Sequence, residues 1–373
     1  MKKTLLFFCL PLFFSCGENS NSEKAESENI LDNLTFTVDT LILDVGEEIF
    51  NPGAYYGRDL NEDGEIAYWF YEPEKQIHEY DLANLKLKAI HSFETDGPNA
   101  IPSYLNNFQA LPNQEFFMAD YAKTGVYSLD GAQVLNLRIQ LENIAGFDPE
   151  ATFSLTNNVH LSPDKKKILS LPNNFAGPVE GFAVIDREKM TGNLRQLPAL
   201  EITDKYNVSF EQGNGISRSG DFQSLQYLNE LFFIYSGATS DIYTYDWKTD
   251  SLTLHSFPHR LVAKSKTGDF ATQVDSNERR WEVGKEMRKQ ITFGKFYWDE
   301  SRSMYFRFGS MTNENDKTTV YLFAYDGKLN LQGETAMEGL ENMFYQAFFR
   351  KGKLYNYSIV GEDPALIEYS FDF

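Results

Sequence analysis

The sequence predicts an all-β fold, a six-bladed β-propeller of four-stranded antiparallel blades, and three observations support this prediction. A strand pattern that ends in an aromatic or aliphatic residue followed by Asp recurs along the chain. Each copy stands among alternating, aromatic-rich runs of the kind that form antiparallel strands. The chain has almost no helical pattern, and 15% of its residues are aromatic, which favours strands. Repeats of four short strands are typical of propeller blades.

The recurring motif is expected to form the third strand of each blade. Its Asp suits the turn that follows, because an Asp side chain accepts hydrogen bonds from nearby backbone N–H groups. Five copies end in Asp and a sixth has Ser instead, at 77–81, 126–130, 182–186, 242–246, 321–326 and 365–370. Two strand-like runs precede each copy, and a fourth run follows each of the first five.

The two ends of the chain predict how the ring of blades closes. The last copy lies next to the C-terminal Phe373, so the sixth blade lacks a fourth strand of its own. The alternating run at 35–43 fits that place, and its pairing with the last blade would remove the free sheet edges. Two separate β-sandwiches are the alternative, and they would not need this N-terminal strand.

The N-terminus predicts export and attachment of a lipid. Residues 1–15 combine two lysines with a short apolar run, which is typical of a bacterial signal peptide. Ser15 and Cys16 look like a lipoprotein cleavage point, although Phe13 stands where such motifs usually have Leu. Residues 16–33 are rich in Ser, Asn and Glu and predict a disordered tether, followed by a single propeller domain at 34–373.

The composition limits the partners that the chain can have. Its formal net charge of −20 argues against nucleic acid and anionic lipid as partners. Attachment to the membrane is therefore expected through the lipid on Cys16, with the protein in the cell envelope and at the outer membrane. The sequence leaves the side of that membrane open. Since the only other cysteine is Cys9 in the leader, no disulfide is expected in the mature fold.

The longer connectors predict a face for binding. In a propeller, the links between blades and the links between second and third strands emerge on one face, and irregular loops often carry function. Drift in loop length is the alternative. The candidate ligand contacts around the expected central channel are Arg58, Asn107, Gln109, His160, Arg218, Tyr227, Tyr297 and Gln346. Hydrogen bonding between neighbouring blades would explain the same residues.

Segment 260–295 has a charge balance opposite to that of the whole chain, with nine Lys or Arg against five Asp or Glu. Residues 276–291 predict a helical insertion capped by Ser276. Its expected buried face carries Trp281, Gly284, Met287 and Ile291.

The basic helix has a functional and a structural interpretation. In the functional one it lies over the channel mouth, where Arg280 and Arg288 would contact an anionic ligand. In the structural one its charges pair along its own surface, as Glu282 with Lys285 and Glu286 with Lys289.

Residues 59–64 contain the local motif most suggestive of a metal. Asp59, Asn61 and Asp63 place oxygen atoms at alternate positions before a glycine, as at the start of a Ca²⁺-binding loop. The motif is similar to the calcium loops of integrin-type propellers, but Ala67 and Phe70 stand where further ligands belong. A plain hairpin turn is the alternative.

The leader, the tether and the repeated strands resemble a family of Bacteroidota envelope lipoproteins known only as a domain of unknown function. The resemblance covers nearly the whole chain, including residues 293–299 and 305–308. It implies the propeller fold and the envelope location, and it implies no activity.

Familiar catalytic motifs are missing from the sequence. It contains no Gly-x-Ser-x-Gly elbow, no His-Glu-x-x-His helix and no phosphate-binding glycine loop, and its five histidines lack metal-ligand spacing. The leading hypothesis is a membrane-anchored, non-enzymatic protein that binds a protein or glycan ligand. The alternative is a channel-mouth hydrolase or lyase that acts on a glycan with the help of Ca²⁺. Whether the chain is an enzyme therefore stays open.

Overall fold

The computed structural model describes residues 29–48, 51, 55–174, 177–213, 215–340, 342–344 and 346–373. The leader, Cys16 and most of the expected tether lie outside the described residues. None of the helices within these ranges combines the length and the apolar character that crossing a bilayer requires.

Strands dominate the described part of the chain, where they form seven sheets, six of them four-stranded. Five of the four-stranded sheets keep their strands in chain order: β2 (Tyr55–Leu60), β3 (Ile66–Tyr71), β4 (Gln76–Asp81) and β5 (Lys86–Ser92); β6 (Asn107–Leu111), β7 (Glu115–Ala119), β8 (Thr124–Ser128) and β9 (Gln133–Leu137); β10 (His160–Leu161), β11 (Lys167–Ser170), β12 (Phe182–Asp186) and β13 (Thr191–Arg195); β16 (Gln223–Leu228), β17 (Leu231–Ser236), β18 (Ile242–Asp246) and β19 (Ser251–His255); β21 (Thr292–Asp299), β22 (Met304–Thr312), β23 (Thr318–Asp326) and β24 (Leu331–Met337). Neighbouring strands in each of these sheets are antiparallel.

The sixth four-stranded sheet joins the two ends of the described chain. It contains β25 (Ala347–Arg350), β26 (Lys353–Val360), β27 (Asp363–Asp372) and β1 (Thr35–Ile42). β1 pairs with β27 in antiparallel register along its whole length, from Thr35 opposite Asp372 to Ile42 opposite Ala365. The predicted pairing of the N-terminal strand with the last sheet is therefore present.

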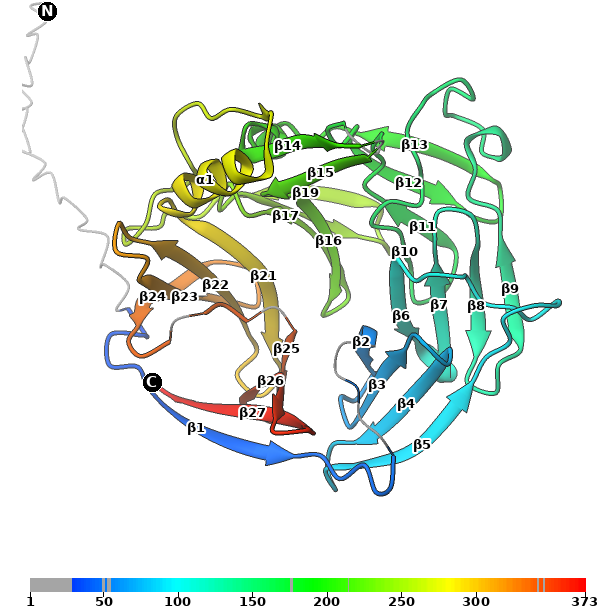
Figure 1. The fold of residues 1–373 in the computed structure, drawn as a ribbon, viewed down its shortest axis with the longest axis horizontal. Helices are drawn as coiled ribbons and strands as arrows, with labels where there is room; N and C mark the ends of the chain where they lie inside the picture. The colour runs from blue at the N-terminus through cyan, green and yellow to red at the C-terminus, as the bar shows by residue number, and fades with distance from the viewer. Residues whose placement is uncertain are drawn as a thin grey trace, which may run out of the picture.

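Figure 1 shows the six four-stranded sheets arranged around a common centre, with β2, β6, β10, β16, β21 and β25 as the inner strands. The inner strands of the first two sheets approach each other closely. A Cβ atom at Gly57 of β2 would lie 2.5 Å from the Cβ atom of Phe108 on β6, so only glycine fits there.

The Asp residues of the recurring motif form the turns that the sequence predicts. Asp81 accepts hydrogen bonds from the backbone N–H groups of Ala83 and Asn84, each at 2.9 Å. Asp186, Asp246 and Asp326 accept from the N–H group two residues further on, at 3.1, 2.8 and 2.9 Å. The motif thus links the third and fourth strands for a local chemical reason.

A three-stranded sheet and a helix depart from the repeated pattern. The sheet contains β14 (Asn207–Gln212), β15 (Gly215–Gly220) and β20 (Gln273–Val274), and β20 runs parallel to β14. Helix α1 (Asn277–Arg288) packs on it, and 3-10 helices lie at Pro112–Gln114, Leu141–Asn143 and Pro198–Tyr206. The described residues thus form seven sheets where the sequence predicts six.

Helix α1 lies within the predicted insertion, but its buried face differs from the expected one. Ser276 caps the helix by accepting a hydrogen bond from the N–H group of Arg279 at 3.2 Å. Val283, Gly284 and Met287 are buried, whereas Trp281 is 56% exposed. The expectation for Trp281 is wrong because its face of the helix points to solvent, where the Arg280 guanidinium lies 5.0 Å from its ring.

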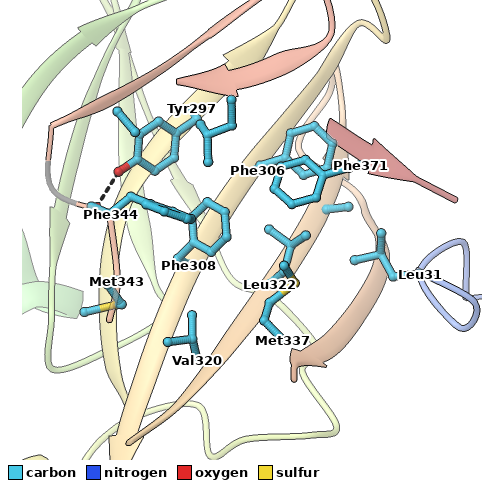
Figure 2. Close-up of a cluster of buried hydrophobic side chains, with 13 residues drawn as sticks. Leu31, Tyr297, Phe306, Phe308, Val320, Leu322, Met337, Met343, Phe344 and Phe371 are labelled. Atoms are coloured by element: carbon cyan, nitrogen blue, oxygen red, sulfur yellow. Dashed lines mark hydrogen bonds between the residues drawn. The ribbon is translucent and has the colours of Figure 1, made fainter. Parts of the chain in front are cut away.

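Apolar side chains pack between the last two four-stranded sheets, and Figure 2 shows part of this core around Phe306, Phe308 and Leu322. Leu31 belongs to the same core and is fully buried. Asn29 holds this segment in place, donating to the Glu334 carbonyl oxygen at 3.0 Å and accepting from its N–H group at 2.9 Å. Because residues 29–33 pack against β24, the predicted tether boundary at residue 33 is too late.

Candidate functional site

Two of the predicted ligand contacts join neighbouring sheets instead. The amide of Gln109 donates to the carbonyl oxygen of Leu161 at 2.8 Å and accepts from its N–H group at 3.0 Å. Asn107 donates to the carbonyl oxygen of Val159. These hydrogen bonds connect β6 with β10 and its preceding residue. The interpretation of both residues as links between blades is thus favoured over ligand contact.

Gln226 plays the same role two sheets further on, and the sequence analysis missed it. Its amide donates to the carbonyl oxygen of Phe296 at 2.9 Å and accepts from its N–H group at 3.3 Å. Gln109 and Gln226 both lie on the first, inner strand of a repeated sheet. Their equivalent positions in the repeat could have revealed this role from the sequence.

Two other candidates are likewise engaged in contacts within the protein. Tyr297 donates its hydroxyl hydrogen to the carbonyl oxygen of Phe344. Arg218 donates to the side-chain oxygen of Asn207 at 3.2 Å and to the carbonyl oxygen of Gly177 at 3.1 Å. Arg218 therefore holds β15 to a connector and does not lie on an inner strand, contrary to its expected place beside the channel.

His160 and Tyr227 stand on the inner strands β10 and β16, as expected. Burial lowers the pKa of His160 to about 4, so its imidazole is neutral at physiological pH. Burial raises the pKa of Tyr227 to about 12, and its ring packs 5.0 Å from that of Phe232. Both side chains are therefore uncharged hydrogen-bonding groups.

The charges of helix α1 pair largely with acidic neighbours. Lys289 contacts Glu286 at 2.8 Å, as the structural interpretation predicts, whereas Lys285 contacts Asp316 at 2.8 Å. Figure 1 shows α1 beside β14 near the periphery of the ring, which does not support a place over the channel mouth.

The remaining charges of α1 were only partly predicted. Glu282 contacts Arg279 at 2.8 Å, so its predicted pairing with Lys285 is wrong. Arg280 donates to the side-chain oxygen of Asn277, and Arg288 lies exposed in the last turn.

The predicted calcium ligands lie at the end of β2 and in the turn that follows it, and each side chain accepts a backbone hydrogen bond. Asp59 accepts from Ala110 at 2.8 Å, Asn61 from Ile66 at 2.9 Å, and Asp63 from Glu65 at 2.9 Å. In the ranges that the structure describes, no group of three or more His, Cys, Asp or Glu side chains could hold a metal ion. These contacts favour the turn interpretation of the motif.

Asp59 instead belongs to a group of charged and aromatic side chains that we call the inner-strand cluster, made of Arg58, Asp59, Lys295 and Tyr357. Arg58 and Asp59 lie on β2, Lys295 on β21 and Tyr357 on β26, so the cluster draws on three sheets. Arg58 lies 5.3 Å from the Tyr357 ring and donates to the side-chain oxygen of Gln346.

A β-bulge sets the position of Lys295. Phe293 pairs with Gly309 and Phe296 with Arg307, so Gly294 and Lys295 together lie opposite one residue of β22. A bulge of this kind changes the direction in which a side chain points and is common beside functional sites. Gly294, a glycine inside a strand-like run, is a local signal for such a bulge that the sequence analysis did not use.

Arg307 holds the bulge in place through a hydrogen bond to its backbone. This residue was not among the candidates in the sequence analysis. Its guanidinium is fully buried and donates to the carbonyl oxygens of Gly294, Ser240 and Ser236 at 2.8, 2.9 and 3.1 Å. Burial lowers the pKa of Arg307 to about 10, so the group stays charged at neutral pH. The backbone that carries Lys295 is thus tied to the neighbouring sheet.

Asp59 and Lys295 have pKa values displaced toward neutrality. Burial raises the pKa of Asp59 to about 6, although hydrogen bonds from the N–H groups of Ala110 and Leu60 and the charge of Lys295 act against it. Burial lowers the pKa of Lys295 to about 8, and the charge of Asp59 opposes that shift. Perturbed pKa values of this kind are concentrated at functional sites.

The cluster offers a rigid carboxylate, an ammonium group and a guanidinium on inner strands. The carboxylate keeps free lone pairs after its two backbone hydrogen bonds, and the ammonium lies 5.1 Å from the Tyr297 ring. Such groups can hold a polar ligand, or they can accept and donate protons near neutral pH.

Comparison with solved structures places the fold. A member of the DUF4221 family from Bacteroides vulgatus ATCC 8482 has a TM-score of 0.62 at 13% identity, covering 91% of this chain and 98% of that one. A protein from Bacteroides fragilis NCTC 9343 described as exported has a TM-score of 0.49 at 12% identity, covering 91% and 95%. The β-propeller domain of Cps50 (Swd1) from Myceliophteria thermophila has a TM-score of 0.38 at 8% identity, covering 89% and 99%.

Among curated proteins, none matches this chain. The model of a domain of unknown function, DUF4221, matches residues 28–336, which is most of the chain. The similarity to the Bacteroides vulgatus structure agrees with this match. The chain therefore belongs to the DUF4221 family.

Proposed function

We propose that this chain is a lipoprotein of the bacterial cell envelope whose folded domain binds a ligand without converting it. The leader at 1–15 and the cysteine that follows support export and anchoring through Cys16 at the outer membrane. Metabolic labelling with an alkyne fatty acid tests the anchor. The wild type should be labelled and sediment with outer membranes, whereas Cys16→Ala should do neither.

We propose further that the six four-stranded sheets are blades of one closed propeller and that β14, β15 and β20 form an inserted sheet. Three contacts at the place where the last four-stranded sheet meets the first support this proposal. β1 pairs with β27, Asp44 forms a parallel bridge with Lys86 at the start of β5, and Lys351 contacts Glu65 at 2.9 Å. The last two contacts join the sixth four-stranded sheet and its flanking segment to the first.

The inner-strand cluster carries the proposal of ligand binding. The Asp59 carboxyl and the Lys295 ammonium carry opposite charges and belong to different sheets. Burial displaces the pKa values of both groups. Holding charges at partly buried positions lowers stability, so their retention on a fixed backbone favours a role in binding. A small dipolar ligand would supply the ammonium that Asp59 attracts and the carboxylate that Lys295 attracts.

Thermal unfolding with a panel of amino acids and dipeptides tests this ligand class. N-acetylated and C-amidated forms of each compound serve as probes that lack one charge. A dipolar probe should raise the Tm of the wild type, and both the singly charged forms and the variants Asp59→Asn and Lys295→Met should lose the effect. Lys189→Met is the matched control, since that lysine side chain is 75% exposed on an outer turn.

One observation favours a second function, proton transfer. A carboxyl with a pKa of about 6 and an ammonium with a pKa of about 8 are suited to general acid–base chemistry at neutral pH. The corresponding enzyme would be a hydrolase or lyase that acts on a glycan. Turnover of a polysaccharide panel by the wild type, lost in Lys295→Met, would replace the non-catalytic proposal.

A further inference from the structure

A cavity of about 360 Å³ lies away from the inner-strand cluster, at the outer part of the second four-stranded sheet. It is lined by the loop between β7 and β8, the end of β9 and the segment that follows. These segments are a link between second and third strands and a link to the next sheet. They belong to the two classes of connector from which the sequence predicts a binding face.

The floor of the cavity is rigid and largely uncharged. Thr124, Leu137, Ile139 and Thr156 are buried there. The hydroxyl of Thr124 donates to the carbonyl oxygen of Leu137 at 2.8 Å, which joins β8 to the end of β9. The floor can therefore keep its shape in the absence of a ligand.

The rim of the cavity is rich in planar polar groups. Asn136, Arg138, Gln140, Glu142 and Asn143 are exposed there. Asn143 donates to the side-chain oxygen of Gln140 at 3.0 Å, which orients the two amides relative to each other. With vicinal hydroxyls, the amides can both donate and accept hydrogen bonds, Arg138 can donate a pair and Glu142 can accept a pair.

An exposed aromatic ring completes the rim. Tyr121 lines the cavity and is 58% exposed. Its loop is held by Asp120, which accepts hydrogen bonds from the N–H groups of Ala122 and Lys123 at 2.6 and 2.5 Å. An exposed ring on this loop, beside planar polar groups, suits the apolar face of a pyranose.

The charges around the cavity come close to cancelling. Arg138 and Glu142 stand on the rim with opposite signs. Lys123 also lines the cavity, but its ammonium donates to the carbonyl oxygen of Ala100 and Asp120 lies buried beside it. The site thus has no strong preference for an anion or a cation.

We infer that this cavity binds a neutral carbohydrate, with the Tyr121 ring against one face of a pyranose and the rim amides, Arg138 and Glu142 on its hydroxyls. The volume of about 360 Å³ lies at the lower end of the range for small-molecule sites, which suits one or two sugar units. This inference does not depend on the ligand proposed for the inner-strand cluster.

Saturation-transfer NMR and calorimetric titration test the inference with maltose, cellobiose, methyl α-D-mannopyranoside and N-acetyl-D-glucosamine as probes. At least one probe should bind the wild type, Tyr121→Ala should weaken it at least tenfold, and Tyr121→Phe should retain it. Tyr104→Ala is the matched control, because Tyr104 is 73% exposed elsewhere. Asp59→Asn should also leave binding unchanged, which separates this site from the inner-strand cluster.

Three outcomes would overturn the inference. They are no binding of any probe to the wild type, equal affinity of Tyr121→Ala and Tyr104→Ala, and tighter binding of D-glucuronate than of D-glucose. The last outcome would show that the site selects an anion.

Discussion

The carboxyl group of Asp59 is subject to opposing influences. Backbone N–H groups of Leu60 and Ala110 and the charge of Lys295 favour its ionised form, while burial disfavours it more strongly. The net effect is a pKa of about 6 in the folded chain, against 3.8 for an unperturbed Asp. The folded protein therefore binds more protons than the unfolded chain between these two pH values.

This difference predicts how stability depends on pH. Ionisation of Asp59 lowers stability as the pH rises from about 4 to 6, and the loss is complete above the folded-state pKa. Asp59→Asn should therefore gain stability relative to the wild type between pH 4 and pH 7, by about 1–2 kcal/mol after allowance for solvent screening. Urea unfolding at both pH values measures this gain.

Asp39→Asn is the control for that measurement, since Asp39 lies exposed on β1. A gain of the same size in this control would assign the effect to net charge. An identical stability difference for Asp59→Asn at both pH values would contradict the raised pKa.

Sequence reasoning found Asp59 but gave it a different role. The spacing of Asp59, Asn61 and Asp63 is a local pattern, so it could be read from the chain, and it suggested a metal loop with a plain hairpin turn as the alternative. The partner of Asp59 could not be found in this way, because Lys295 is distant in sequence and reaches the site through a bulge. That bulge depends on Arg307, whose burial follows from tertiary packing.

At the scale of single elements, the β2–β3 hairpin predicts the response to calcium. Asn61 and Asp63 already accept backbone hydrogen bonds that close the turn, and Asp59 accepts one from Ala110 on β6. We therefore expect millimolar Ca²⁺ or a chelator to leave the Tm unchanged within about 1 °C. A saturating ion at 100 times its dissociation constant would add about 2.7 kcal/mol. An increase of several degrees with Ca²⁺, lost in Asp63→Ala, would contradict the turn interpretation.

The repeated elements were predictable from the sequence and the inserted ones only in part. The motif ending in Asp marks the third strands because its turn is encoded locally, as at Asp81 and Asp186. Helix α1 was predictable from Ser276, whereas its buried face was not, since that depends on the inserted sheet beneath it.

The inserted sheet left a single local signal, the Gly213–Asn214 pair between β14 and β15, which is typical of a hairpin. Its third strand, β20, is only two residues long and pairs with β14 from a distant part of the chain. No periodic pattern could reveal a strand of that length.

For the whole molecule, the pairing of β1 with β27 predicts the effect of a truncation. Deleting residues 29–42 would expose the backbone of β27 and remove Leu31 from the core between β24 and its neighbours. We expect the deletion to lower the Tm by about 10 °C or more, since it should remove several kcal/mol of unfolding free energy. We also expect aggregation that increases with protein concentration. Calorimetry and light scattering measure both effects, and a deletion of residues 2–28 that keeps the wild-type Tm is the control.

An unchanged Tm after removal of 29–42 would mean that β1 adds no stability to the last sheet. It would also remove the main support for a closed ring of blades.

The same pairing has a consequence for the time course of folding. Thr35, near the start of the described chain, must meet Asp372 at its other end, so this sheet has contacts of nearly maximal sequence separation. Folding slows as the mean sequence separation of contacts grows. While the C-terminal strands are still being synthesised, the last sheet cannot form and β1 has no partner. The chain therefore reaches its final state only after its last strand is complete, and until then the backbone edge of β1 stays unpaired.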